Sequence, residues 1–266
     1  MGNSQPYEQV LTDRLLRSWI RCPRKAWLDR YGNRDKRIWT AYRNLQLDHQ
    51  QQSFIELIPH NTGRGLEACQ KGAKGVLGLR LKGKSIAGDR IESHPPLLQK
   101  ISGKSIWGKF SYRPVIARQG KRITKEHKLA LAFIAILLEP FQEAPVPNGI
   151  TVSKNKNGLE IDQFFFTKHL FLKLEDCLSK LKADLSLKEP PPLTSDRKKC
   201  TLCAWQNLCN HEAKMEGHLS EVSGVGGKRR QMLQELGING IEELASSNPI
   251  LLSKNLKKLG EQHSAI

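Results

Sequence analysis

The sequence predicts a mixed α/β core followed by an all-helical tail, and three observations indicate this fold class. Residues 124–139 are strongly apolar and have the length of a buried helix. Two apolar stretches, 149–154 and 159–166, surround Asn157-Gly158, a pair that favours a two-residue hairpin turn. From Leu219 onward, helical patterns punctuated by glycine replace the strand patterns.

Helices are expected at the beginning of the chain and after the central strands. Thr12 is the expected N-cap of the first helix, and Pro23 interrupts that helix just after Cys22. A longer helix is expected over 37–57. The apolar helix should begin after Thr124 and end before Pro140. The amphipathic pattern of 167–187 predicts one more helix before a proline-rich connector.

The middle of the chain has the character of strands. Residues 76–81 and 85–91 flank Lys82-Gly83-Lys84, which is interpreted as a hairpin-like break. Residues 106–117 form a longer candidate strand. The order of elements therefore indicates strands enclosed by helices.

The chain is strongly basic, with 266 residues, a formal charge of +17 and a pI of about 9.8. The segment 64–128 holds 16 basic and 4 acidic residues, a net charge of +12. An excess of this density repels itself unless a polyanion relieves it, so nucleic acid is the expected partner. A solvated basic surface is the alternative.

Neither a membrane partner nor secretion is expected. The longest apolar run, 129–138, has ten residues, which is too short to span a bilayer. The first ten residues lack the basic and apolar regions of a signal peptide. The expected location is the cytoplasm, where cysteines serve as thiols or metal ligands rather than as disulfides.

Cysteine spacing predicts a metal site. Cys200 and Cys203 can aim two sulfurs at one centre from a tight turn, and Cys209 follows a short helical step later. The fourth ligand has three candidates, namely Cys22, Cys69 and Cys177. Cys22 lies among basic residues that favour the thiolate.

A glycine-rich turn marks the tail. Gly224 and Gly226 let the backbone approach a phosphate closely, and the free N–H groups at the next helix start can bind the anion. Lys228, Arg229 and Arg230 add positive charge at the same place, without sequence selectivity. The segment resembles a helix–hairpin–helix module, with an ordinary interhelical turn as the alternative.

Taken together, these motifs resemble the RecB-like putative nucleases of the PD-(D/E)XK superfamily. The likeness rests on the early Cys22-Pro23-Arg24, the late C-x2-C-x5-C, Tyr112-Arg-Pro114 with the helix after it, and the tail. It implies a restriction-endonuclease-like mixed sheet with flanking helices over 1–212 and a helix–hairpin–helix domain over 213–266. Relatives often continue into a further domain, so a short form is one interpretation of this chain.

The resemblance also implies a [4Fe–4S] cluster that ties the chain ends together. Its ligands would be Cys22, Cys200, Cys203 and Cys209. Zinc also accepts four thiolates, but zinc sites usually pair two short motifs, whereas one cysteine here lies far from the other three. Iron–sulfur is therefore preferred over zinc and over no metal.

The nuclease motif itself is degenerate. The family has a helical His, a Pro-Asp turn, a Glu/Asp-x-Lys strand and a helical Gln and Tyr, which together hold Mg²⁺ or Mn²⁺. The corresponding positions here are Tyr42, Pro96, Ile116-Ala117-Arg118, Ala130 and Ile134. Apolar residues cannot bind a hard cation, so no catalytic residue is assigned. Glu126-His127-Lys128 matches Glu-x-Lys formally, but it starts a helix and is interpreted as chance.

The preferred function is a nuclease-like DNA-binding protein in repair, recombination or nucleic-acid processing, with its metal site lost. The alternative is an active metal-dependent exonuclease or endonuclease of the same family. A scaffold associated with RNA or ribosomes would fit the charge alone. DNA binding is expected to be directed at phosphates, without strong sequence preference.

Overall fold

The chain divides into two units. The computed structural model describes residues 10–39, 41–58, 60–194 and 197–260. The first unit comprises residues 1–30 and 41–189, and the second comprises 31–40 and 190–266. The predicted domain boundary between residues 212 and 213 stays a prediction.

A six-stranded mixed sheet forms the centre of the first unit. Its order is β2 (Thr62–Arg64), β3 (Gly75–Leu77), β6 (Leu97–Ser105), β7 (Gly108–Ala117), β8 (Asn148–Asn155) and β9 (Gly158–Phe165). Strands β6 and β7 are antiparallel, as are β8 and β9. Strands β7 and β8 are parallel, because the helix α5 (Lys125–Gln142) carries the chain back between them.

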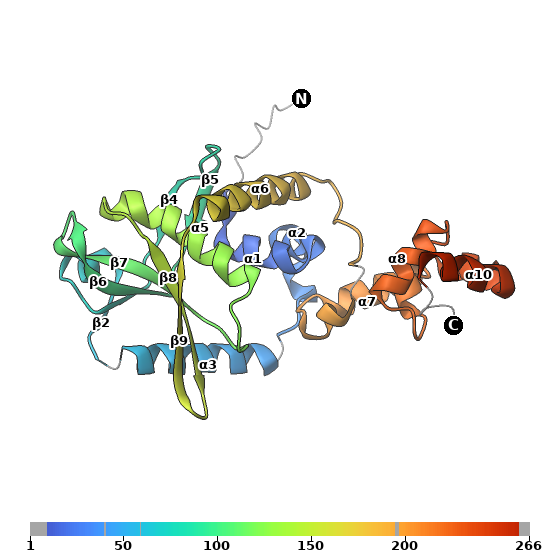
Figure 1. Ribbon diagram of the computed structural model, residues 1–266, viewed down its shortest axis with the longest axis horizontal. Helices are drawn as coiled ribbons and strands as arrows, with labels where there is room; N and C mark the ends of the chain where they lie inside the picture. The colour runs from blue at the N-terminus through green and yellow to red at the C-terminus, as the bar shows by residue number, and fades with distance from the viewer. Residues whose placement is uncertain (1–9, 40, 59, 195–196, 261–266) are drawn as a thin grey trace. The chain divides into compact units, whose positions relative to one another are not determined.

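Helices cover both faces of this sheet (Figure 1). Helix α3 (Ala41–Leu57) lies on one side, and α5 and α6 (Lys168–Leu185) lie on the other. A smaller sheet, in the order β1 (Leu11–Thr12), β5 (Arg90–Ser93), β4 (Leu81–Lys84), packs under α5. Short helices α1 (Asp13–Arg21), α2 (Pro23–Tyr31) and α4 (Gly65–Gln70) complete the unit. The mixed α/β fold class is thereby confirmed.

The start of α5 follows the sequence prediction, but its end does not. Thr124 caps the helix, and the His127 side chain completes a capping box. Nearly every residue from Leu129 to Leu138 is buried in the main core. The expected end before Pro140 is wrong, since the helix continues through Pro140 to Gln142. A proline in the last turn removes only one late hydrogen bond, and the buried side chain of Gln142 fixes the final turn.

The structure also differs from the sequence predictions at β4, at β6 and at the start of α3. Lys82-Gly83-Lys84 is not a break but part of strand β4, and the chain turns after it at residues 85–89. A β-carbon on Gly83 would lie 2.8 Å from a methyl of Leu137 on α5, so the strand passes the helix closely. Strand β6 was not expected as a strand, and α3 begins at Ala41 rather than at residue 37.

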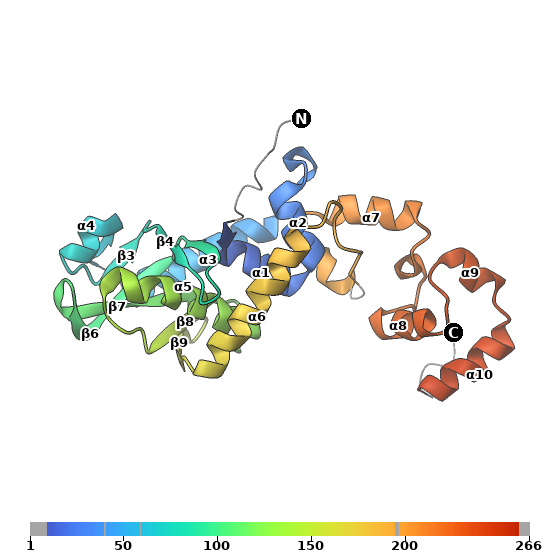
Figure 2. The ribbon, with the colours of Figure 1, turned by 90° about the horizontal axis from the view of Figure 1, so that it is seen from above.

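The second unit is helical. It contains the 3-10 turns η1 (Arg34–Lys36), η2 (Arg197–Leu202) and η3 (Leu219–Glu221), and the helices α7 (Gln206–Met215), α8 (Gly227–Glu235), α9 (Ile241–Ser246) and α10 (Pro249–Leu259). Figure 2 shows α8, α9 and α10 at the C-terminal end of the chain. Their small core consists of Leu219, Val225, Met232, Leu233, Ile238 and Leu256. Among the described helices of both units, none combines the length and apolar character needed to cross a bilayer.

Candidate nucleic-acid interface

The three late cysteines lie on one short stretch of backbone. Cys200 is in η2, and the N–H of Cys203 donates to its carbonyl at 2.9 Å, so both thiols belong to one turn. Cys209 follows in α7 and is buried. The Arg197 guanidinium donates to the Cys209 carbonyl at 3.3 Å and thereby connects η2 to α7.

The early cysteine terminates a helix. Cys22 is the C-cap of α1, its N–H donates to the Ser18 carbonyl at 2.9 Å, and its side chain is partly exposed. It belongs to the first unit, whereas Cys200, Cys203 and Cys209 belong to the second. No three His, Cys, Asp or Glu side chains of the described residues are grouped closely enough to hold an ion. The four-sulfur centre therefore stays a prediction.

The two remaining cysteines lie in the main core. Burial raises the pKa of Cys69 to about 11 and raises the pKa of Cys177 above its ordinary value. Both groups are thus protonated at neutral pH, and a protonated thiol is a poor metal ligand. Their surroundings identify these two cysteines as core residues.

The glycine turn of the tail has the geometry of an anion site. Gly224 has a φ of +81°, a value that glycine adopts without strain. Gly226 is the N-cap of α8, and no side chain caps the helix start. The first N–H groups of a helix have no partner inside the helix, so they face the turn. Lys228 is exposed in the first turn, and Arg229 donates to the Gly224 carbonyl at 3.0 Å.

The third basic residue of the turn is placed differently. Arg230 is 1% exposed, and its guanidinium donates to the Thr194 carbonyl at 3.3 Å. A second nitrogen lies 3.5 Å from Nδ1 of His218. Desolvation, followed by the charge of Arg230, lowers the pKa of His218. Because Arg230 is buried, its hydrogen bonds stabilise the fold of the tail. Lys228 and Arg229 are therefore the stronger candidates for phosphate contact.

Apolar packing occupies the ends of β6 and β7, where the family resemblance implies acids. Leu97 pairs with Val115 across β6 and β7, and Val115 pairs with Ile150 on β8. Directly paired residues share a face of the sheet, and this face lies under α3. Together with Val152, with Phe54 of α3 and with Ile58 directly after that helix, these side chains form a buried apolar cluster, called here the α3-side core.

The positions compared with the nuclease motif have other roles. Pro96 directly precedes β6, whereas Ile116 points into the main core on the opposite face. Ala130 and Ile134 are buried in α5. The Tyr42 hydroxyl donates to Oε1 of Gln119 at 2.6 Å and so joins α3 to the loop after β7.

Arg118, the position compared with the catalytic lysine, is a structural cation. Its side chain is 2% exposed, its Nε donates to the Thr151 hydroxyl at 3.2 Å, and it pairs with Glu160 and Asp162 of β9. Its charge is therefore already compensated within the sheet.

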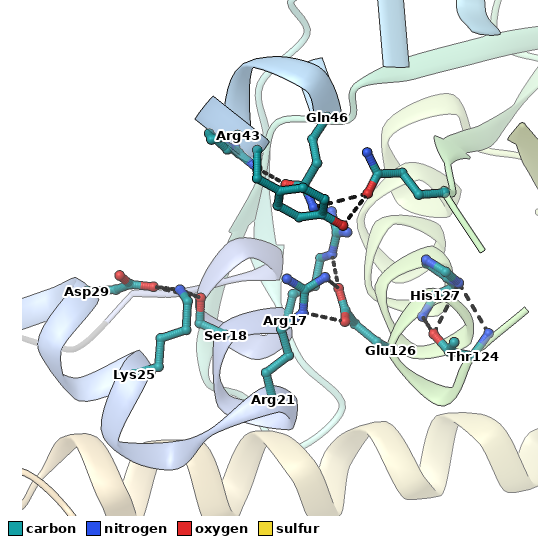
Figure 3. Close-up of polar contacts among 12 residues, drawn as sticks. Arg17, Ser18, Arg21, Lys25, Asp29, Arg43, Gln46, Thr124, Glu126 and His127 are labelled. Carbon is teal, nitrogen blue, oxygen red and sulfur yellow. Dashed lines mark hydrogen bonds and ion pairs between the residues drawn. The ribbon is translucent and has the colours of Figure 1, made fainter. Parts of the chain in front are cut away.

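Glu126 is an ion-pair partner rather than half of a catalytic pair. Figure 3 shows Arg17 and Arg21 of α1 converging on its carboxylate, with Nε–O distances of 2.9 and 2.7 Å. Burial alone would raise the pKa of Glu126, but these two arginines outweigh it and lower the pKa. Lys128 points elsewhere, with its ammonium 4.7 Å from the Phe164 ring centre.

One notable residue on the sheet was not singled out from the sequence. Arg113 is the middle residue of the Tyr112-Arg-Pro114 motif, and its side chain lies on the α3 side of the sheet, as do those of Val115 and Ala117. Side chains alternate between the two faces of a strand, and this alternation along β7 was the sequence signal that could have placed Arg113 on the same face as Val115. Its polar partners depend on strand register, which the sequence does not reveal.

Comparison with known proteins leaves the family open. No protein-family model matches this chain, and no curated protein matches it. Among solved structures, the crystal structure of SSO0001 is similar, with 14% sequence identity over 78% of this chain and 88% of that chain. The TM-score is 0.41.

Proposed function

We propose that this chain is a RecB-type, nuclease-like protein that binds DNA through phosphates and does not cut it. The observation that carries the binding role is the uncapped start of α8 beside the Gly224 turn, with Lys228 exposed in its first turn. Backbone N–H groups and a lysine at one helix start suit a phosphate of any sequence. The formal charge of +17 supports the same partner.

The apolar ends of β6 and β7 favour binding over cleavage. A metal-dependent nuclease needs carboxylates that converge on a cation. Leu97, Val115 and Ile150 instead pack against Phe54 and Ile58 in the α3-side core. A divalent cation in that packing would have no oxygen ligand from these side chains.

Removal of either basic group at the α8 start should weaken DNA binding. Lys228→Gln and Arg229→Gln are each expected to reduce the slope of log affinity against log salt by about 1, since each change removes one phosphate contact. Fluorescence anisotropy with a labelled oligonucleotide over a range of salt measures this slope. Lys156→Gln, in the exposed turn between β8 and β9, is the matched control and should leave the slope almost unchanged.

Two outcomes would contradict the proposal. A salt-independent complex would exclude phosphate-directed binding. Cleavage of single- or double-stranded DNA by the purified chain in the presence of Mn²⁺ would exclude a purely binding role and favour the active nuclease.

The iron–sulfur clip belongs to the same proposal. Cys22, Cys200, Cys203 and Cys209 would hold the cluster, whose role is to connect distant parts of the chain. Closing a loop of this length by ligation restricts the unfolded chain, with a stabilisation on the order of 4 kcal/mol by analogy with disulfides. Thiols in a tight turn and at a helix end are a suitable donor set.

Anaerobically purified protein is expected to contain about four iron and four sulfide per chain. Cys22→Ser should lose most of the iron, because serine replaces a soft thiolate ligand. Cys177→Ser is the control and should retain it, since that thiol is buried in the main core. Iron content is measured by colorimetric assay. Stoichiometric zinc in place of iron would contradict the cluster.

A further inference from the structure

A row of four side chains crosses the sheet next to the α3-side core. Gln99 on β6 pairs with Arg113 on β7, and Asn148 on β8 pairs with Phe165 on β9. The Arg113 guanidinium donates to Oδ1 of Asn148 at 3.0 Å, which joins the two pairs. We call these four residues the cross-sheet row. It lies on the α3 side, because each of its residues on β6, β7 and β8 is two positions from a member of the α3-side core.

Arg113 contributes a positive charge that its neighbours do not cancel. Its Nε and Nη2 donate to Oε1 of Gln99 at 2.9 and 2.8 Å, so all three of its side-chain hydrogen bonds are to neutral amides. Within the described part of the chain, no carboxylate pairs with it. By contrast, Arg118, which directly follows β7, pairs with Glu160 and Asp162. Burial lowers the pKa of Arg113, which reflects the cost of holding this charge without a counterion.

The guanidinium retains capacity for a ligand. Arginine has five N–H donors, and three of them are used by Gln99 and Asn148, so two remain. The two amide side chains hold the guanidinium plane in place. An oriented, partly desolvated guanidinium binds phosphate oxygens better than a mobile surface lysine does.

Positive charge continues at the β6 end of the row. An open pocket of about 390 Å³ is lined by Leu57, Ile58, His60, Lys74, Gln99 and Lys100. Gln99 belongs both to this pocket and to the row. The Lys100 ammonium is held by the Gly72 carbonyl at 3.1 Å and by the Phe110 ring, whereas Lys74 is exposed. Lys74 can therefore contact a second phosphate in this pocket.

An aromatic ring ends the row on β9. Phe165 is 61% exposed, although its neighbours Phe164 and Phe166 pack edge to face on the other side of the strand. It lies two strands from Arg113, a distance of roughly 10 Å from the spacing of strands in sheets. That distance is within reach of a phosphate and a base of neighbouring nucleotides. Exposed rings that stack on bases are characteristic of single-strand binding, because a duplex hides its base faces.

From these observations we propose that the cross-sheet row is a second nucleic-acid site, separate from the tail, which binds a short single strand. One phosphate would contact Arg113 and another Lys74, and a base would stack on Phe165. This inference rests on the proposed nucleic-acid binding function and assigns part of it to the sheet. It requires no metal and no bond cleavage.

Photo-crosslinking with the full chain tests where a single strand lies. A single-stranded oligonucleotide that carries 5-iodouracil is irradiated with the protein, and the linked peptide is identified by mass spectrometry. We expect a crosslink at Phe165 that disappears in Phe165→Leu. Crosslinks confined to residues 213–266 would overturn the inference and leave the proposed function intact.

Affinity measurements provide the second test. Phe165→Leu and Lys74→Gln change exposed side chains and should leave the fold unchanged. Each is expected to weaken single-strand binding, by about tenfold for the stacking residue, and to change duplex binding by less than twofold. Ile161→Ala, at another exposed apolar position on β9, is the matched control. DNA and RNA strands of one sequence are compared to determine which sugar is preferred.

The two possible failures are distinguishable. If Phe165→Leu binds single strands as tightly as the unchanged protein does, while Lys228→Gln still lowers the salt slope, only the cross-sheet row is rejected. If the unchanged protein binds neither single strands nor duplex, the proposed function fails first and this inference fails with it.

Discussion

Replacing Gln142 with leucine is expected to lower the free energy of unfolding of the first unit by about 3 kcal/mol. Its side chain is completely buried at the end of α5. Oε1 accepts from the Tyr112 N–H at 2.8 Å, and Nε2 donates to the carbonyls of Tyr112 and Ala144 at 3.2 and 3.3 Å. Leucine would leave these backbone groups buried without a partner.

The size of the effect follows from the position of Tyr112. Strand β7 pairs with β8 only from Val115 to Ala117, so Tyr112 lies before that pairing begins. Because β8 does not pair with β7 at Tyr112, the Gln142 side-chain amide takes its place. It accepts from the N–H of Tyr112 and donates to the carbonyl of the same residue. Loss of both contacts exposes the full desolvation cost of the two backbone groups.

Hydrogen exchange of the β7 peptides, combined with urea denaturation, measures this change. Gln142→Leu should accelerate exchange at Tyr112 and lower the urea midpoint. Gln163→Leu is the matched control, because Gln163 is exposed on β9. Equal stability of Gln142→Leu and the unchanged protein would show that solvent or backbone movement satisfies Tyr112 without the amide.

Glu126→Gln is expected to cost about 2 kcal/mol at neutral pH, and the cost should vanish in acid. The carboxylate accepts from Nε of Arg17 and from Nε and Nη2 of Arg21, with the last distance 3.0 Å (Figure 3). Its side chain is 12% exposed, so solvent screens these contacts only partly. The amide keeps the shape of the residue but removes the charge.

The sign of the pH dependence follows from the lowered pKa of Glu126. Its ordinary value is 4.5, and the folded protein holds it lower. The stabilisation by Glu126 is therefore fully present above pH 4.5 and is lost as the pH falls through the lower folded pKa. Urea denaturation at several pH values measures the difference between the two proteins.

Glu67→Gln is the control for this series. Glu67 pairs with Lys71 on the surface of α4, where both side chains are more than 70% exposed. Exposed pairs contribute little, so this change should have almost no effect at any pH. A difference between Glu126→Gln and the unchanged protein that persisted below the folded pKa of Glu126 would contradict the ion-pair explanation.

Local signals in the sequence were sufficient for the starts of α1, α5 and α6. The predicted threonine caps Thr12 and Thr124 begin α1 and α5, as their side-chain hydrogen bonds confirm, and the structure adds a cap at Thr167, the first residue of the predicted 167–187 helix. The strands β8 and β9 around the Asn157-Gly158 turn were also predicted, although the pairing of Asn155 with Gly158 moves the turn by one residue. Each of these signals lies within a few residues of the feature that it specifies.

Features that depend on distant contacts were missed. Lys82-Gly83-Lys84 has the composition of a turn, but the close approach of α5 requires glycine within a strand at that place. The cross-sheet row depends on the register of four strands, and a shift of one residue would point Arg113 to the other face. The apolar replacement of the acid positions was expected from the sequence, whereas the pairing of Leu97 with Val115 became visible only with the register.

The division of the chain into units has a consequence for synthesis on the ribosome. Residues 31–40 belong to the second unit, although the first unit continues on both sides of them. The Ile38 N–H donates to the Ala204 carbonyl at 2.9 Å, so a segment that is synthesised early bonds to one that is synthesised late. Translation must pass residue 204 before this hydrogen bond can form. A fragment that begins at residue 190 would lack this hydrogen bond. Because residues 31–40 belong to the second unit, a single cleavage of the chain does not separate the two units.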